Sequence, residues 1–419
     1  MKNNSFTVAV LGAGNIGTAV IRRLLEVDNE VLNLNLSKVL VSDLSKKRDL
    51  DAGLLTTDFD EILNDENIDL VIEVLGGVEP GKGYIKDLLE SGKSVITANK
   101  DIIADCGGEL IQLAQKNNVC LYFEAAVAAG IPVLKPLIES LRGEELTRVA
   151  GIINGTSNYI LTSMEEGSTY QDALQQAQEL GYAEPDPTND VDGIDAKYKA
   201  MILSLLCFGV SPSAEEVFTD GISNITKEDF DWAKWLNKTI KLVAQIDNSI
   251  DGFNARVYPV LVDSKHPLAA IRGALNAVLV EGENINQLVF SGPGAGSAPT
   301  ASAIIGDVLS ACHQMLSSQT NWYPLRTPKS GDKEFKDVQS SWFIRLSVKD
   351  EPGVLATIAG IFGENNVSIE SVIQEGRGDN AELVLVTHEA EEDNLTSSIE
   401  SISKLSSVSS VTSTIRVYI

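Results

Sequence analysis

The chain has 419 residues. This length predicts two or three domains, because a single hydrophobic core seldom exceeds about 250–300 residues. Hydrophobic residues make up 43% and charged residues 22% of the sequence, a composition typical of globular proteins. The 59 acidic side chains outnumber the 33 basic ones, and the net charge of −26 argues against binding to nucleic acid or to an anionic membrane. Any histidine-based catalysis or metal binding has to use His266, His313 or His388, since no other histidine occurs.

The four cysteines form no CxxC pair, which predicts reduced thiols rather than a disulfide framework. The N-terminal residues enter a strand pattern without a signal peptide, and no uncharged apolar run reaches transmembrane length. We therefore expect a soluble, cytoplasmic protein that binds neither membranes nor nucleic acid.

The N-terminal segment carries the pattern of a dinucleotide-binding unit. An apolar run at residues 6–11 is followed by a GxGxxG loop and then by apolar positions at helical spacing. In such a unit the first glycine permits a tight turn, the second lets the backbone approach a pyrophosphate, and the third lets the helix pack on the strand. The N-terminus of the helix favours the phosphates. We expect the cofactor to contact Gly12, Ala13, Gly14, Asn15, Ile16 and Gly17.

Strands and helices continue to alternate after this loop. We predict strands at 39–42, 70–75, 94–97 and 120–123, and helices at 84–90 and 108–116. This alternation predicts an α/β fold, a Rossmann-type doubly wound parallel sheet that binds ligands at the carboxyl ends of its strands.

The residues after the second strand do not distinguish NAD from NADP. An acid at this position holds the ribose hydroxyls of NAD, whereas basic groups hold the additional phosphate of NADP. Asp43 and the basic run 46–48 are both present, and the basic run is equally compatible with a solvated helix start.

The pattern changes after Pro132. A strand is predicted at 146–153, followed by an Asn-Gly turn in which Thr156 or Ser157 is expected to cap the next helix. Segment 181–199 is rich in carboxylates and proline, which predicts an ordered loop leading into a helix.

Three carboxylates and a lysine are expected to converge at the start of this helix. Asp195 and Lys199 are four residues apart and share a helix face, while Glu184 and Asp190 lie on the preceding loop. A surface ion pair with capping acids would explain the Asp195–Lys199 spacing, but it explains less well why Glu184 lies in a proline-rich, partly apolar loop.

Six motifs in this order resemble those of homoserine dehydrogenases. They are GAGNIG at 12–17, TANK at 97–100, EAAVAAGIP at 124–132, GIINGTSNYIL at 151–161, GYAEPDP…DVDGIDAKYK at 181–199, and GPGAGSAPTASA at 292–303. The resemblance covers most of the chain and implies reversible NAD(P)-dependent reduction of L-aspartate 4-semialdehyde to L-homoserine.

The resemblance also implies roles by position. Lys199 matches the proton-donating lysine of the family, and Lys100 a second lysine beside the nicotinamide and the substrate. Hydride transfer leaves an alkoxide that needs a proton, and no histidine lies in these motifs. The remaining substrate-binding residues are expected to be Glu184, Asp190, Asp195, Gly155 and Thr156, and the remaining cofactor-binding residues Gly76, Asn99 and Gly296.

A monovalent cation, expected to be sodium, is implied at a site built largely from backbone carbonyls of Glu124, Val127, Ala129 and Ile131; a plain strand-to-loop crossover is the alternative for this stretch. Two positions depart from the family pattern. Cys106 stands where many relatives have histidine, and Ser42 replaces a frequent arginine, which weakens the case for strict use of NADP.

The second glycine-rich loop, at 292–296, precedes apolar residues at helical spacing through Cys312. The resemblance implies that the chain returns here to the nucleotide-binding domain. His313 beside this apolar face and His266 before Pro267 are expected to be structural or surface residues.

The C-terminal segment has the element order βαββαβ, the ferredoxin-like arrangement. Strands are predicted at 342–348, 367–372, 381–387 and 408–417, with helices from Val354 to Phe362 and at 395–405. The segment resembles an ACT domain, which implies binding of an amino acid, with L-threonine as the natural candidate; a purely oligomerising domain is the alternative. The expected allosteric residues are Asp350, Gly353, Val354, Leu355, Asn366 and Ile369.

These observations predict three domains and a linker. We expect a nucleotide-binding domain at 1–131 that is completed by 300–322, an α+β catalytic and dimerisation domain at 132–299, a linker at 323–340, and the ACT domain at 341–419. The resemblance implies a homodimer or homotetramer.

Two other functions fit parts of the sequence. A dehydrogenase acting on 3-phosphoglycerate or prephenate would need a catalytic histidine, and it would not explain segment 184–199. A catalytically inactive amino-acid sensor is disfavoured by the intact set of Lys100, Glu184, Asp195 and Lys199.

Overall fold

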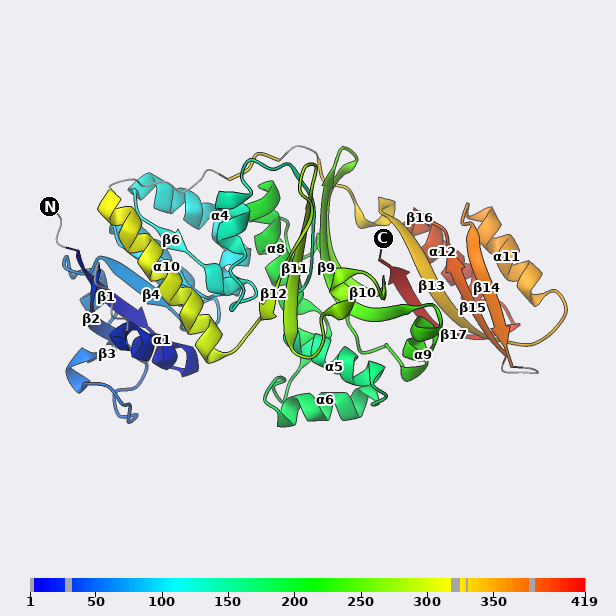
Figure 1. Ribbon diagram of the computed structural model, residues 1–419, viewed down its shortest axis with the longest axis horizontal. Helices are drawn as coiled ribbons and strands as arrows, with labels where there is room; N and C mark the ends of the chain where they lie inside the picture. The colour runs from blue at the N-terminus through cyan, green and yellow to red at the C-terminus, as the bar shows by residue number, and fades with distance from the viewer. Residues whose placement is uncertain (1–3, 27–31, 318–324, 329–330, 377–380, 419) are drawn as a thin grey trace. The chain divides into compact units, whose positions relative to one another are not determined.

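The computed structural model describes residues 4–26, 32–317, 325–328, 331–376 and 381–418 (Figure 1). The chain forms two compact units, each assembled from segments that are distant in the sequence. The first unit comprises 1–146, 201–213 and 282–328, and the second comprises 147–200, 214–281 and 329–419. Each unit has a hydrophobic core of its own.

A six-stranded parallel sheet forms the centre of the first unit, with the strand order β3-β2-β1-β4-β5-β6. The strands are β1 (Ser5–Leu11), β2 (Asn33–Leu40), β3 (Leu55–Thr56), β4 (Leu70–Glu73), β5 (Ser94–Thr97) and β6 (Leu121–Tyr122). The strand order reverses between β1 and β4, where ligands of such sheets bind. The predicted doubly wound parallel sheet is therefore confirmed.

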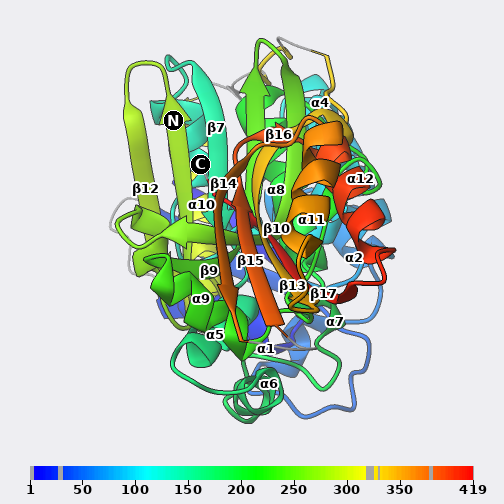
Figure 2. The same ribbon diagram turned by 90° about the vertical axis from the view of Figure 1, so that its right-hand side faces the viewer.

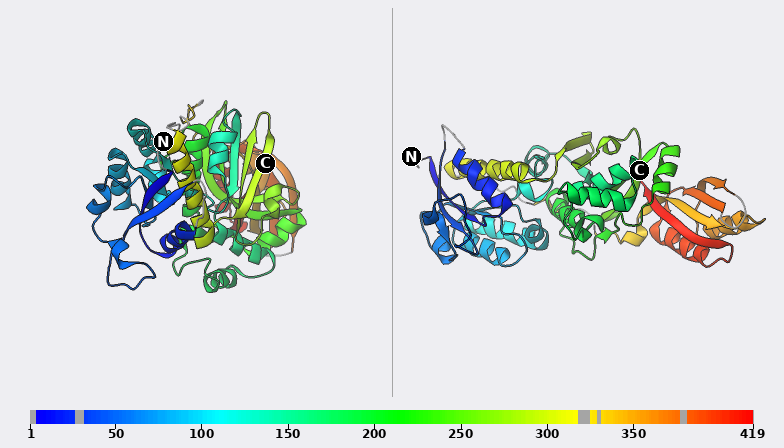
Figure 3. Two further views of the ribbon diagram at one scale, coloured as in Figure 1. Left: turned by 60° about the vertical axis from the view of Figure 1, so that its left-hand side comes forward. Right: turned by 90° about the horizontal axis from the view of Figure 1, so that it is seen from below.

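Helices cover this sheet, and one of them comes from far along the chain. They are α1 (Asn15–Glu26), α2 (Asp60–Leu63), α3 (Gly81–Glu90), α4 (Lys100–Asn117) and α10 (Ser297–Ser317). Figures 1 and 3 show α10 beside α1, and Ile304 and Val308 of α10 share a core with Val20 of α1 and Val10 of β1. The helices that cover this sheet thus come from segments about 300 positions apart in the sequence.

Several element predictions in this unit were wrong in their bounds: for example, the helix predicted at 84–90 begins at Gly81, and the strand predicted at 70–75 ends at Glu73. The second strand spans Asn33–Leu40 instead of 39–42; residues 33–38 are exposed or only partly buried, and only the last two residues are fully buried. The helix predicted at 108–116 begins at Lys100, where Asn99 caps it. Gly107 and Gly108, which resemble a helix start in the sequence, lie inside the helix, and a Cβ at Gly107 would lie 3.2 Å from Leu205.

The second unit contains a mixed sheet with helices α5 (Gly155–Glu165), α6 (Tyr170–Glu179), α7 (Thr188–Val191), α9 (Lys227–Trp235) and the start of α8 (Ile194–Phe208). Its strands before residue 300 are β7 (Leu146–Ile152), β8 (Phe218–Thr219), β9 (Lys238–Ser249), β10 (Gly252–Asp263) and β11 (Leu275–Gly282), while β12 (Asn286–Pro293) belongs to the first unit. The long antiparallel pair of β9 and β10 is buried along most of its length, so it shows no alternating pattern in the sequence.

The C-terminal module of the second unit has the predicted order βαββαβ. Its elements are β13 (Gln339–Val348), α11 (Val354–Glu364), β14 (Ile369–Glu375), β15 (Ala381–Thr387), α12 (Glu392–Ser403) and β17 (Val408–Val417), with the two-residue β16 (Ala390–Glu391) pairing with β13. The strand order is β17-β13-β15-β14, and Figure 2 shows α11 and α12 on the same face of the strands. Ile358, Phe362, Leu395 and Ile402 from the two helices form the core with this sheet.

The module is continuous with the rest of the second unit. Its last strand, β17, pairs with β13 on one side and with β10 in parallel on the other, so a single sheet runs from β11 to β14. A buried ion pair supports this junction, since the Arg345 guanidinium lies 2.8 Å from Asp229 of α9 and 2.8 Å from Glu382. The side chain of Asp229 is fully buried.

Part of the predicted linker at 323–340 lies outside the described residues. Gly331 and Lys333 pair with β10, because Phe253 donates to the Gly331 carbonyl oxygen and Lys333 donates to the Phe253 carbonyl oxygen at 2.7 Å. Arg326 instead donates to the carbonyl oxygens of Leu141 and Glu144. In the described ranges, no helix combines the length and the apolar character needed to span a bilayer.

Replacing Arg345 with methionine tests the junction. The change leaves Asp229 buried without its guanidinium partner, so we expect the free energy of unfolding to fall by about 3–5 kcal/mol. The control is Lys38→Met, which breaks a partly exposed pair with Glu61 and should cost less than about 1 kcal/mol. Denaturant unfolding of the full chain measures the free energy of unfolding of both variants. An equal decrease in the two variants would contradict a larger contribution from the buried ion pair.

Candidate functional site

The glycine loop after β1 has the geometry expected of a pyrophosphate site. Gly12 has a φ of +106°, and a Cβ there would lie 2.8 Å from the Val74 carbonyl oxygen. A Cβ at Gly17 would collide with the Gly12 carbonyl oxygen, because helix and strand are tightly packed. A Cβ at Gly14, in contrast, meets no atom of the chain within 4 Å, so packing within the protein does not require glycine there. In dinucleotide-binding loops, glycine at this position lets the backbone approach the pyrophosphate.

The ends of β4 and β5 are joined by hydrogen bonds that begin at a buried carboxylate. Glu73 accepts from the Thr97 hydroxyl at 2.6 Å and from the Leu75 amide at 2.8 Å. The Asn99 amide donates to Thr97 Oγ1, and Asn99 Nδ2 donates to the Gly77 carbonyl oxygen at 2.6 Å. Burial raises the pKa of Glu73, although the Thr97 hydroxyl and the Leu75 amide oppose the shift. Sequence reasoning missed Glu73, because it lies inside the run 70–75 that predicts a buried strand.

Gly76 and Lys100, two predicted cofactor-binding residues, follow the ends of β4 and β5 in the chain. Gly76 has a φ of +82°, and a Cβ there would meet no atom within 4 Å. Lys100 is the first residue of α4, and its Nζ lies 3.7 Å from the Asp101 carboxylate. Gly296, with a φ of +113°, immediately precedes α10.

Cys106 lies at a kink inside α4, where its φ of −141° departs from helical values. The thiol donates to the Ile102 carbonyl oxygen, and burial raises its pKa to about 11. The thiol is therefore protonated at neutral pH and unsuited to act as a nucleophile.

The turn after β2 presents both signs of charge, as the sequence indicates. Asp43 accepts from the amide and the hydroxyl of Ser45, and these hydrogen bonds lower its pKa. Arg48 donates to the carbonyl oxygens of Asp43 and Lys46. NAD and NADP both remain candidates at this turn.

The predicted cation-binding segment is part of a turn whose backbone amides bind the carboxylate of Glu124. The Glu124 carboxylate accepts from the amides of Val133, Leu134 and Lys135 at 2.7–2.9 Å, so its oxygens are engaged by the backbone. Asp307 of α10 accepts from the Glu124 amide. Among the described residues no hydrogen bond reaches the carbonyl oxygens of Val127, Ala129 and Ile131. Neutral carbonyl oxygens of this kind are suitable ligands for a hard cation.

In the second unit, Asn154 is at the centre of the carboxylate cluster. Its side chain caps α5 by accepting from the Ser157 amide, so the prediction that Thr156 or Ser157 caps this helix was wrong. Its Nδ2 donates to Asp190 at 2.7 Å and to Asp195 at 2.9 Å. Burial raises the pKa of Asp190, with hydrogen bonding from Asn154 opposing the shift. Asparagine is a strong helix cap, and this preference is the signal in the sequence that could have identified Asn154.

Lys199 joins the same cluster from the first turns of α8. Its Nζ donates to Asp195 Oδ2 at 2.6 Å and to the Ile153 carbonyl oxygen at 2.8 Å. The side chains of Lys199 and Asp195 are only 12% and 13% exposed, so the pair is largely removed from water. An ammonium has three donors, and these two hydrogen bonds leave one for a third acceptor.

The other predicted substrate-binding residues are Gly155, Thr156 and Glu184, and they differ in their contacts and exposure. Thr156 donates to the Tyr182 carbonyl oxygen at 2.7 Å, and a Cβ at Gly155 would lie 2.8 Å from the Ala274 carbonyl oxygen. Glu184 is exposed, and its backbone oxygen accepts from Gln178. The structure thus brings together Asp190, Asp195 and Lys199 through Asn154, and it leaves the carboxylate of Glu184 in solvent.

The turn predicted to be allosteric opens α11. Gly353 has a φ of +95° and precedes the helix, and Asp350 accepts from Gln374 of β14 at 2.9 Å. Val354 is buried, whereas Leu355 is 41% exposed. Asn366, with a φ of +58°, lies in the turn between α11 and β14, and Ile369 is the first residue of β14.

Comparison with family models divides the chain into three matches. Residues 132–309 match the homoserine dehydrogenase model, residues 12–124 match the NAD-binding domain of homoserine dehydrogenase, and residues 342–407 match the ACT domain.

Individual relatives agree with these matches over nearly the whole chain. Homoserine dehydrogenases of Mycobacterium bovis and Bacillus subtilis are 42% and 39% identical, and each alignment covers 98% of the chain and at least 97% of the relative. The structure of a homoserine dehydrogenase from Thiobacillus denitrificans superposes with a TM-score of 0.93 at 35% identity, covering 99% of this chain and 98% of that one. A hyperthermophilic archaeal homoserine dehydrogenase mutant in complex with NADPH has a TM-score of 0.65 at 30% identity, covering 74% and 98%.

Two glycine substitutions separate the binding of the nucleotide from the packing of the loop. Gly14→Ala adds a methyl group that meets no atom of the chain, so we expect unchanged thermal stability but a KM for the nucleotide that rises about tenfold or more. Gly17→Ala is the contrasting variant, and it should lower the Tm because its Cβ collides with the backbone. Steady-state kinetics with NADH and NADPH measure the first effect, and an unchanged KM in Gly14→Ala would refute it.

Proposed function

The chain belongs to the homoserine dehydrogenase family, and from this membership we propose which residues carry out its NAD(P)-dependent reaction between L-aspartate 4-semialdehyde and L-homoserine. The observation that carries the assignment is the buried cluster in which Lys199 and Asp195 meet Asn154 and Asp190. It combines a proton donor with carboxylates that are suited to a substrate ammonium group.

The first unit holds the nucleotide in this proposal. The loop at 12–17 and the start of α1 bind the pyrophosphate, and Gly76, Asn99, Lys100 and Gly296 complete the cofactor-binding set. When bound, the nicotinamide supplies a hydride to the carbonyl carbon of the semialdehyde, and a negative charge then develops on the carbonyl oxygen. The open space at Gly14 and Gly76 supports this assignment.

Lys199 donates the proton that the developing alkoxide needs. Asp195 and the Ile153 carbonyl oxygen hold its ammonium by two of three donors, which leaves the third for the substrate oxygen. After transfer the proton is bound to the hydroxyl of homoserine, and neutral Lys199 regains one from solvent. Lys100 stabilises negative charge on the same oxygen as a second cation.

The carboxylates bind the other end of the substrate. Asp190 and Asp195 accept from its α-ammonium group, Glu184 contributes from the exposed loop, and Thr156 and Gly155 shape the start of α5. Asn154 is a positioning residue, because it fixes both aspartates through one side chain.

Lys199→Met tests the proton donor. Loss of a general acid typically costs 10²–10⁴-fold in turnover, so we expect kcat to fall by about that factor while the nucleotide still binds. Lys197→Met is the matched control on the same helix and should keep near-normal turnover. Oxidation of NADH and NADPH with the semialdehyde measures both variants, and near-normal turnover in a folded Lys199→Met enzyme would overturn the assignment.

The turn at 124–131 binds a monovalent cation, with sodium as the expected ion. Backbone carbonyl oxygens of Glu124, Val127, Ala129 and Ile131 supply the ligands, and the Glu124 carboxylate keeps the turn in place through three amides. The cation would add rigidity to the turn that precedes Pro132.

Exchange of the ion tests this site. Replacing sodium chloride with choline chloride at constant ionic strength should lower turnover by about tenfold, because choline is too large for the carbonyl oxygens to surround. Thermal unfolding in both salts controls for loss of folding. Equal turnover in the two salts would contradict a required cation.

The C-terminal ACT domain makes an amino acid the expected effector, and L-threonine is the candidate we propose. We propose a nucleotide-binding domain at 1–131 completed by 300–322, a catalytic domain at 132–299, and an ACT domain at 341–419. Residues 323–340 form the connection to the ACT domain. Self-association as a dimer or tetramer is supported by the exposed apolar side chains of Leu288 and Val289 on β12 and Val372 on β14.

A further inference from the structure

Glu73 is a fully buried acid to which the proposed mechanism assigns no role. It is the last residue of β4, and 0% of its surface is exposed. In the sheet it is in register with Leu11 of β1 on one side and with Thr97 of β5 on the other. Three loops follow these strands and hold most of the proposed cofactor-binding residues: the cofactor loops 12–17, 74–77 and 98–100. Glu73 therefore lies where the three cofactor loops leave the sheet.

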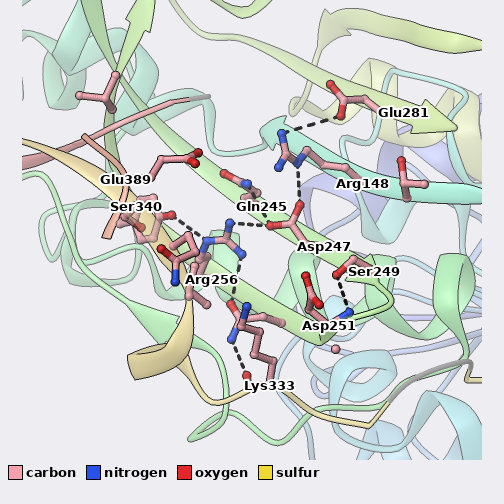
Figure 4. A pocket seen from close by; sticks show the side chains of 17 residues that line it. Arg148, Gln245, Asp247, Ser249, Asp251, Arg256, Glu281, Lys333, Ser340 and Glu389 are labelled. Carbon is pink, nitrogen blue, oxygen red and sulfur yellow. Dashed lines mark hydrogen bonds and ion pairs between the residues drawn. The ribbon is translucent and has the colours of Figure 1, made fainter. Parts of the chain in front are cut away.

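Glu73 differs from the acids Asp247 and Asp307 in having no cationic partner. The fully buried carboxylate of Asp307 pairs with Lys135 Nζ at 2.8 Å. In Figure 4 the carboxylate of Asp247 lies beside the guanidinium group of Arg256, with which it forms an ion pair. Among the described residues, no lysine, arginine or histidine forms an ion pair with Glu73. A buried carboxylate without a cation is costly unless hydrogen bonds compensate it.

Donors at the ends of β4 and β5 supply this compensation. The Leu75 amide donates to Glu73 Oε1 at 2.8 Å, and the Thr97 hydroxyl donates to Glu73 Oε2 at 2.6 Å. The Gly76 amide and the Asn99 side chain also favour the charged form, so they oppose the rise in pKa that burial causes. The carboxylate is thus stabilised by the same segments that carry the proposed cofactor contacts.

The hydrogen bonds continue from Thr97 to the residues proposed to bind the cofactor. Thr97 Oγ1 accepts from the Asn99 amide at 2.9 Å, and Asn99 Nδ2 donates to the Gly77 carbonyl oxygen at 2.6 Å. This path leads from Glu73 through β5 and back to the cofactor loop after β4. Asn99 also caps α4, whose first residue is Lys100. The start of α4 is therefore held by a path that begins at the carboxylate.

Close packing fixes the end of β4 on its other sides. A Cβ at Gly81, the first residue of α3, would lie 3.3 Å from Glu73 Oε1. The amide of Val74 donates to the Leu11 carbonyl oxygen at 2.9 Å, and the Val74 carbonyl oxygen would lie 2.8 Å from a Cβ at Gly12. A displacement of Glu73 would therefore also reach the cofactor loop after β1.

Filling the space at the end of β4 does not require a carboxylate. A glutamine has nearly the same shape, but only one of its two end groups accepts hydrogen bonds. It can therefore serve the Leu75 amide only by leaving the Thr97 hydroxyl proton without an acceptor. We propose that Glu73 is a positioning residue for hydride transfer, which acts through Thr97 and Asn99 to hold the cofactor loops after β4 and β5 in the arrangement that binds the nucleotide. The inference rests on the proposed cofactor contacts of Asn99 and Lys100.

Glu73→Gln tests the inference in the full-length enzyme, with NADH and NADPH as probes. Fluorescence titration measures nucleotide binding directly, without turnover. We expect the Kd of the tighter-binding nucleotide to rise about tenfold or more, the typical effect of losing one hydrogen bond to a charged group, and kcat to fall by a similar factor. The Tm should not fall, because the amide removes a buried charge that has no cation.

Two further variants separate positioning from stability. Lys93→Met is the matched control, because Lys93 is only 6% exposed and donates to the carbonyl oxygens of Asp65 and Ile68, before β4 begins. Its loss should lower the Tm and leave the Kd for the nucleotide unchanged. Asn99→Ala should weaken nucleotide binding, and adding Glu73→Gln to it should weaken binding little further, because both changes act through the same side chain.

Each outcome decides for or against the positioning role. Wild-type nucleotide affinity and turnover in Glu73→Gln overturn the inference, as does an equal loss of affinity in Lys93→Met. Additive losses in the double variant overturn it too, because they show that Glu73 does not act through Asn99. Weakened binding in Asn99→Ala with wild-type binding in Glu73→Gln refutes the inference and leaves the proposed function intact. Wild-type binding in Asn99→Ala refutes both the inference and the proposed cofactor contact of Asn99.

Discussion

The position of β17 between β10 and β13 is the constraint on which the second unit depends. Arg416 and Val417 of β17 pair in parallel with Val260 and Leu261 on one side, and β17 pairs with β13 along its length on the other side. Arg416 takes part in both pairings, and its guanidinium lies 4.7 Å from the ring centre of Trp342 and 3.0 Å from the buried Glu392. Because the final strand of the chain completes a sheet begun by earlier segments, the module cannot separate from the catalytic strands without breaking backbone hydrogen bonds.

This junction is physically connected with the carboxylate cluster. Arg416 is within 3.7 Å of Asp220, which follows β8, and the Asp220 amide donates to Val257 of β10. Two residues later, the Ile222 amide donates to the Val191 carbonyl oxygen in α7, next to Asp190. A shift of β17 would therefore reach α7, which carries Asp190, through one ion pair and two backbone hydrogen bonds. Such a connection is a physical route for coupling, and measurement of coupling energies establishes whether it is used.

The two units show different ways of preparing a site. In the first, small residues leave space beside the ends of strands, as at Gly14 and Gly76, and a buried carboxylate, Glu73, orders the neighbouring turns. In the second, charged groups are held close together, because Asn154 satisfies two aspartates at once and Lys199 pairs with one of them. The first arrangement suits a large ligand bound through its phosphates, and the second suits a small charged one.

Local patterns in the sequence were sufficient for the parallel sheet, the glycine loop and the βαββαβ order, because each depends on periodicity and turn residues within about 30 positions. They also identified Asp195 and Lys199, which share one helix face. They did not reveal Asn154 as the bridge, the burial of Glu73, or the long strands β9 and β10, whose residues are buried on both faces and so show no alternation. Only the tertiary structure decided that β17 joins β10 and that Arg345 pairs with Asp229, since these contacts connect segments that are far apart in the chain and leave no local signal.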